Sequence, residues 1–282
     1  MQPIRCGLLP GESRSVVEGM NEPLRLWLQR HLHHPVELVV GESHVATAEA
    51  LRRGQLDIAY LGPVSYILQS RNSGLEPFAR PSHGGCVGPT FQTAIIVPAS
   101  SAVQALADLR TREIAMGDLV STSGCWVPRY MLLEAGLSLG RDYERRMLGS
   151  QDQIVHAVAR HEVAAGGVSL KALQRLLTVG EVCADDIRVL AVSLPIPEYM
   201  WTFREGLTED MRDAFRRAFI EMRDPDALAA YHAESFIPAV DADVDRVRGW
   251  MEAVLEARLQ SPNPRRLGHH TLMATLGSTQ WG

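Results

Sequence analysis

The residues best suited to binding a ligand are three consecutive hydroxyl side chains, Ser121, Thr122 and Ser123, which Gly124 follows. They stand between a strand-like segment, 112–116, and a helical pattern. The first backbone N–H groups of a helix have no partner within it and carry the positive end of the helix dipole. Since an N-cap needs only one hydroxyl, we interpret three of them as an anion-binding site.

Cys125 comes directly after this element, in the first turn of the expected helix. The helix dipole stabilises a thiolate in that position. Thiolate is a soft ligand that suits a thiophilic centre such as trivalent arsenic. The alternative is a small buried apolar side chain, which is the usual role of a free cysteine.

A thiol-dependent enzyme is the competing class of function. Cys125 with His156 and an acid such as Asp152 would supply the groups of a thiol nucleophile. No nucleophile-elbow or protease pattern surrounds Cys125, so we predict a protein that is not an enzyme.

The elements that must position these residues alternate between strands and helices. Strand patterns cover 4–9, 36–40, 56–61, 93–97, 112–116, 163–169 and 187–192, and helical patterns cover 16–31, 46–53, 121–135 and 153–160. Three further helical patterns follow at 208–222, 226–235 and 244–259. This alternation predicts an α/β layer structure with a largely parallel sheet. Tyr60 and Tyr66 flank Gly62 at the end of one strand, where α/β folds bind ligands.

Composition narrows the class of protein. The chain has 282 residues, is 46% hydrophobic and 22% charged, and carries a formal charge of −5, which disfavours a nucleic-acid partner. Its four cysteines form no Cys-x-x-Cys pair, so we expect no structural zinc and no cofactor. Cys86 lies in a glycine-rich loop, where it is either a second thiol ligand or an ordinary loop residue. The N-terminus has no signal-peptide pattern. We therefore expect either a cytoplasmic protein or a sequence that begins at a mature or engineered start.

Several segments resemble a known family. They are 53–66, 107–118, 121–129 and 193–197, and the likeness extends over roughly residues 4–255. The chain is similar to the phosphonate, phosphite and phosphate receptors of ABC transporters, a branch of the type II periplasmic binding proteins. The resemblance implies two lobes, with a hinge and a central cleft that closes on an oxyanion. Lobe one would be 1–95 plus 194–260, lobe two 96–193, and the C-terminal tail 261–282.

The resemblance also implies which residues bind the ligand and which partner receives it. The implied ligand-binding residues are Tyr60, Gly62, Tyr66, Thr93, Ser121, Thr122, Ser123, Gly124, Cys125 and Gln151. The implied partner is a membrane permease, which would place a mature chain in the periplasm.

Some positions depart from the family pattern. Phe91 stands where a tyrosine is common, Gln151 where a histidine is frequent, and Ala164 where an aspartate is usual. An acid, Glu198, is present after Pro-Ile-Pro, as in receptors that hold an aminoalkyl group. The loss of charged partners puts a dianionic phosphonate in doubt.

One branch of the family resembles arsenite sensors, which work with a sensor histidine kinase. In this branch a cysteine accompanies the Ser-Thr-Ser-Gly element. We therefore expect arsenite sensing through Cys125, with phosphonate, phosphite or phosphate uptake as the alternative.

Overall fold

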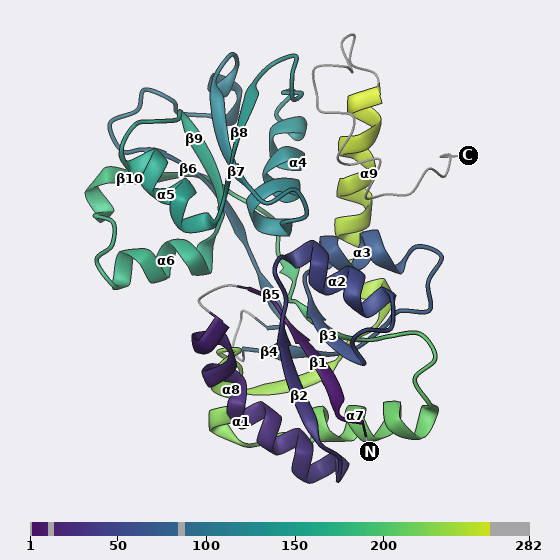
Figure 1. Cartoon of the computed structure of the whole chain (residues 1–282). Coiled ribbons are helices and arrows are strands. Elements are labelled where there is room, and N and C mark those ends of the chain that lie inside the picture. The colour runs from purple at the N-terminus through teal and green to yellow at the C-terminus, as the bar shows by residue number, and fades with distance from the viewer. Residues whose placement is uncertain (1, 11–13, 84–87, 260–282) are drawn as a thin grey trace. The chain divides into compact units, whose positions relative to one another are not determined.

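The computed structural model describes residues 2–10, 14–83 and 88–259, which form two compact units (Figure 1). The first unit consists of the described residues up to Thr90 together with Pro197–Asp245. The second unit consists of Phe91–Ile196 and, from Arg246 on, helix α9 (Asp245–Leu259). The sequence placed the residues of α9 in lobe one, whereas their contacts group them with the second unit. The ring of Trp250 in α9 stacks on Tyr130 of that unit, with centroids 5.1 Å apart.

The sheet of the first unit is mixed. It has six strands in the order β13 (Ser235–Pro238), β4 (Glu76–Ser82), β12 (Met200–Phe203), β3 (Ile58–Leu61), β1 (Ile4–Leu8) and β2 (Val36–Val40). β1 pairs in parallel with β2 and β3, whereas β12 is antiparallel to β3 and β4, and β13 is antiparallel to β4. The expectation of a largely parallel sheet is therefore wrong for this unit, because three of its five strand pairings are antiparallel and β12 and β13 run opposite to the other four strands.

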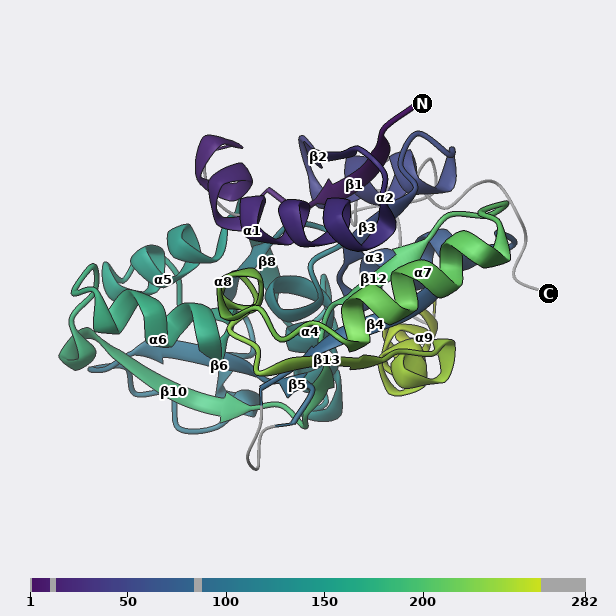
Figure 2. The same ribbon diagram turned by 90° about the horizontal axis from the view of Figure 1, so that it is seen from below.

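Helices and an aromatic core cover this sheet. The helices are α1 (Arg14–Leu32), α2 (His44–Arg52), α3 (Pro63–Ser70), α7 (Glu209–Ile220) and α8 (Pro225–Ala229), with a 3₁₀ turn at Asp241–Val244. Helix α7 packs against β4 and β13 (Figure 2). The stacked rings of Phe78 and Phe203, 3.9 Å apart, form the centre of the core, and Phe219 meets Phe78 edge-on. Helix α1 contains Pro23 and continues through it.

The sheet of the second unit has five strands. Their order is β10 (Ile187–Val192), β6 (Thr93–Pro98), β9 (Ala165–Ser169), β7 (Glu113–Gly117) and β8 (Glu144–Gly149). β7 is parallel to β8 and β9, and β6 is antiparallel to β9 and β10. Thr93 pairs with Ser169, so the amino end of β6 lies at the same edge as the carboxyl ends of β7, β8 and β9.

A π-helical turn separates this sheet from its main helix. The turn spans Thr122–Trp126 and runs directly into α4 (Val127–Glu134). The other helices are α5 (Gln151–Ala159) and α6 (Leu170–Thr178), with 3₁₀ turns at Leu106–Leu109 and Ala184–Asp186. The short strands β5 (Thr90–Phe91) and β11 (Ile196–Pro197) pair where the chain passes from one unit to the other. Among the residues that the structure describes, none of the helices has the length and apolar character that a bilayer span requires.

Candidate functional site

Three strands of the second unit end at one edge, and each leads into a capped helix. Ser121, Ser150 and Ser169 stand at the N-caps of the π-helical turn, α5 and α6. Their hydroxyl oxygens accept hydrogen bonds from backbone N–H groups one turn on, at 3.0, 3.3 and 3.1 Å respectively. Helix N-termini carry partial positive charge and unpaired N–H donors, so their convergence makes this edge suited to an anion.

Ser123 lies at the centre of a hydrogen-bond network at this edge. Its hydroxyl accepts a hydrogen bond from Nε2 of Gln151 at 3.2 Å, and its carbonyl oxygen accepts one from the hydroxyl of Thr93 at 3.4 Å. Oε1 of Gln151 in turn accepts from the backbone N–H of Ser169 at 2.6 Å. The structure thus brings Thr93, Ser123 and Gln151 together in one network, and the binding of a ligand by them stays a prediction.

The close approach of loop and strand explains the glycine in the Ser-Thr-Ser-Gly element. A Cβ atom on Gly124 would lie 3.0 Å from the hydroxyl oxygen of Ser121 and 3.4 Å from the Cα of Gly117. The hydroxyl of Ser121 needs this position to cap the turn, since it accepts its hydrogen bond from the Gly124 N–H. Thr122 and Ser123 are each 1% exposed.

Cys125 has a different environment from the hydroxyl residues. Its side chain is completely buried, and burial raises the pKa of the thiol above its ordinary value of 9.0. Arg129, which contacts the thiol, and the charge of Arg145 act in the opposite direction without reversing the shift. The expectation of a dipole-stabilised thiolate is therefore wrong, because desolvation outweighs the positive charges nearby.

Each residue of the hypothetical thiol nucleophile has another partner in the structure. Nε2 of His156 lies 4.0 Å from a carboxylate oxygen of Glu181, and Asp152 pairs with Arg175 at 2.8 Å. Cys125 contacts Arg129 instead. The three groups that the enzyme alternative requires are thus engaged elsewhere.

The first unit holds the remaining predicted residues. The ring of Tyr60 lies 5.7 Å from that of Tyr199 and 5.1 Å from that of Tyr231, and burial raises its pKa, so the phenol stays neutral. A Cβ atom on Gly62 would lie 3.0 Å from the Tyr199 ring. Tyr66 is 2% exposed and its hydroxyl donates to Asp241 at 2.8 Å, which makes it part of the packing of this unit.

A buried contact between a histidine and a carboxylate in the first unit was missed by the sequence reasoning. Nε2 of His83 lies 2.8 Å from Oε2 of Glu198, with side-chain exposures of 10% and 8%. The sequence drew attention to Glu198 because it follows Pro-Ile-Pro, but no motif surrounds His83. Beyond burial, the charge of Glu198 raises the pKa of Tyr60 and of Tyr199. Cys86 lies outside the described residues.

Comparisons with known proteins agree on one family. The model of the periplasmic substrate-binding protein of phosphonate ABC transporters matches residues 6–244. The phosphate-import protein PhnD of Mycolicibacterium smegmatis is 20% identical over 271 residues, which are 87% of this chain and 84% of the relative.

Two solved structures show the same fold. The binding protein component of an ABC phosphonate transporter from Pseudomonas aeruginosa is 21% identical with a TM-score of 0.78, over 98% of this chain and 94% of the other. PhnD1 from Prochlorococcus marinus, solved with methylphosphonate, is 16% identical with a TM-score of 0.78, over 90% and 98% of the two chains. The type II periplasmic binding fold that the resemblance implies is confirmed.

Proposed function

Because the chain belongs to the family of periplasmic substrate-binding proteins of phosphonate ABC transporters, we propose that it is a receptor that binds a small phosphonate-type oxyanion and delivers it to a membrane permease. Members of this family bind a substrate for transport and do not transform it. The observation that carries the proposal is the network of Thr93, Ser123 and Gln151 beside three helix N-termini. We place its action in the periplasm, where the family works.

The network suits a tetrahedral oxyanion because it offers several neutral donors in fixed positions. Hydroxyl groups, an amide and the backbone N–H groups at helix N-termini can each donate to anionic oxygens, and hydrogen bonds to charged groups are worth about 1.5–3 kcal/mol each. The departure at Gln151 keeps a donor where the family pattern has a histidine. Its Nε2 already reaches Ser123 at 3.2 Å, so the amide replaces the ring in the network.

Arsenite sensing, our principal expectation from the sequence, gains no support. The thiol of Cys125 is buried with a raised pKa, whereas a metalloid ligand must be a thiolate. The relatives described above are named for phosphate and phosphonate, which favours the uptake alternative. A sensor histidine kinase as partner is likewise unsupported, and a permease fits the family.

The test is calorimetric titration of the purified, reduced chain with methylphosphonate, phosphite, phosphate and arsenite. We expect at least one phosphorus oxyanion to bind. Ser123→Ala and Gln151→Ala should each weaken that binding about tenfold, because each removes a donor from the network. Ser101→Ala is the matched control, since its hydroxyl caps the Val103 N–H in the same unit, beyond the other end of β6.

Two results would contradict the proposal. One is binding of arsenite with no response to any phosphorus oxyanion. The other is equal affinity in Ser123→Ala, Gln151→Ala and Ser101→Ala, which would place the ligand away from the network.

A further inference from the structure

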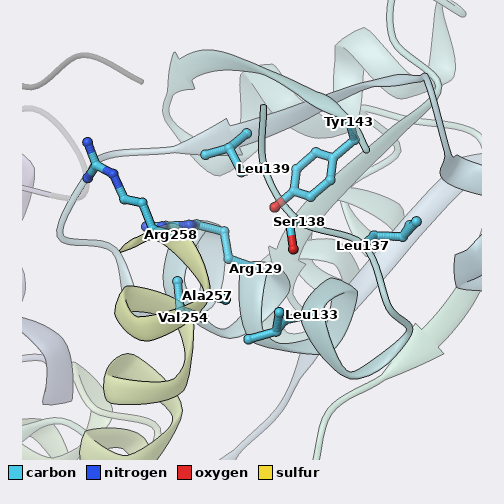
Figure 3. A pocket seen from close by; sticks show the side chains of 9 residues that line it. All are labelled: Arg129, Leu133, Leu137, Ser138, Leu139, Tyr143, Val254, Ala257 and Arg258. Atoms are coloured by element: carbon cyan, nitrogen blue, oxygen red, sulfur yellow. The ribbon is translucent and has the colours of Figure 1, made fainter. Parts of the chain in front are cut away.

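A small cavity lies within the second unit between α4, the loop that follows it, and α9 (Figure 3). Arg129, Ser138, Tyr143 and Arg258 are the polar residues that line it. Its volume of about 20 Å³ has room for one water-sized group. None of the hydroxyl residues of the proposed oxyanion site lines it, so it is a separate feature of the unit.

Arg129 is the residue whose surroundings need an explanation. Its side chain is only 4% exposed, and its Nε has no hydrogen-bond partner in the part of the chain that the structure describes. The guanidinium carbon of Arg129 lies 4.7 Å from the centroid of the Trp126 ring, so the two groups form a cation–π contact. This contact does not provide a hydrogen-bond acceptor for Nε. A buried charge with an unused donor is costly unless an anion is bound beside it.

Further positive charge surrounds this group. Burial lowers the pKa of Arg258, and the charges of Arg129 and Arg145 lower it further, which shows that the three guanidinium groups repel one another. Across the described ranges, neither Arg129 nor Arg145 forms an ion pair with a carboxylate. An anion in the cavity would relieve this repulsion.

The one acid in the adjoining loop is already engaged. The carboxylate of Asp142 pairs with Arg110 and with Arg141, and it accepts a hydrogen bond from the Ser138 N–H at 2.8 Å. It therefore fixes the loop that forms one wall of the cavity instead of pairing with Arg129. The hydroxyl of Tyr143 remains a neutral donor, since burial raises its pKa.

We propose that this cavity is a second anion site, which takes a chloride ion or one oxygen of a small inorganic oxyanion between the guanidinium groups of Arg129 and Arg258. Arginine presents N–H groups in a planar fork that matches such ligands. The small volume excludes an organic substituent, so the site differs in selectivity from the proposed oxyanion site. An anion here joins α4 to α9, two helices that are distant in sequence.

The experiment follows the thermal midpoint of the full chain as sodium sulfate or sodium chloride replaces gluconate at constant ionic strength. An anion that binds only the folded state raises the midpoint by mass action. We expect Arg258→Gln to weaken the apparent affinity at least tenfold, because it removes a charge-assisted contact. Arg129→Lys, which keeps the charge but not the fork, should weaken it as well. The salt that raises the midpoint, chloride or sulfate, identifies the anion.

Two control variants separate this site from other effects. Arg146→Gln removes an exposed arginine that pairs with Glu113 and should leave the response within about twofold, since exposed pairs contribute little. Ser123→Ala, in the proposed oxyanion site, should retain the response. The proposal is overturned if Arg258→Gln responds like the parent chain, if Arg146→Gln loses as much as Arg258→Gln, or if Ser123→Ala abolishes the response.

Discussion

Gln151 shows how one side chain can organise a site that contains no charged group of its own. It donates to the hydroxyl of Ser123 and accepts from the backbone N–H of Ser169, so both ends of its amide are used. The sequence predicted Gln151 and Ser123 as site residues, but not Ser169, because it placed Ser169 at the end of the strand pattern 163–169 and predicted no helix for it to cap. Only the pairing of β9 with β6 shows that this cap lies beside Thr93.

Cys125 could not be interpreted correctly from its position in the chain. The sequence places it in the first turn of a helix, where a thiolate would be favoured. Its protonation depends on burial and on Arg129 and Arg145, which sequence spacing does not reveal. The helix dipole acts over one turn, whereas desolvation depends on everything packed around the thiol.

We predict that Cys125 in the native chain reacts slowly with a thiol reagent at pH 8. Its pKa is raised above 9.0, so little thiolate is present at this pH, and the side chain has no exposed surface. Cys183 is exposed and should react at least tenfold faster. The measurement compares modification rates by mass spectrometry in two chains that each keep one of these cysteines, the other three being serine.

The pH dependence of these rates gives a second check. The rate at Cys125 should keep rising above pH 9, because its thiolate forms only there. Rapid modification of Cys125 at pH 8 that arsenite blocks would contradict this prediction and would favour the metalloid alternative.

A clear apolar pattern did not by itself decide which secondary-structure elements were predicted, since the amphipathic helix α6 and the fully buried strand β12 were missed along with more polar elements. Strands β2 and β10 were predicted with the bounds that the structure has. Strand β8 was missed because Glu144, Arg145 and Arg146 give it no alternation, and as an edge strand it needs none. Strand β4 contains Pro77 and Pro81, which sequence rules treat as arguments against a strand.

The packing of α4 on the sheet leads to a prediction about Gly167 in β9. A Cβ atom there would lie 2.3 Å from Cγ of Pro128, which is fixed in the first turn of α4. Gly167→Ala should therefore destabilise the second unit by about 1–3 kcal/mol through overpacking. Thermal and urea unfolding measure this loss.

The matched control is Gly249→Ala in α9. Nothing lies within 4 Å of its Cβ position, so the added methyl should stabilise the helix by about 0.5–1 kcal/mol. Equal effects of the two substitutions would show that α4 does not pack on β9 as described.

For the whole molecule, the division into two units was predicted from the family resemblance and not from the pattern of elements. Each unit has its own sheet and its own core. The chain passes between them near residues 90, 197 and 245, whereas the prediction had passages only at 95 and 194. The antiparallel orientation of β12 and β6 could not be predicted from their sequences, because the direction of a strand in a sheet depends on its pairing and not on its composition.

The presence of the proposed network in the second unit determines where a bound ligand should stabilise the chain. At a concentration one hundred times its Kd, a ligand that binds only the folded state adds about 2.7 kcal/mol of stability.

Hydrogen exchange with and without methylphosphonate, or whichever oxyanion binds, shows where this stability appears. We expect slower exchange at the first turns of α4, α5 and α6 and at the strand ends before them, because Ser123, Gln151 and Ser169 at these helix starts are joined in the network. Helix α7 packs on the sheet of the first unit and should exchange unchanged. Slower exchange in α7, with no change at these three helix N-termini, would mean that the ligand binds elsewhere than at the Ser123 network.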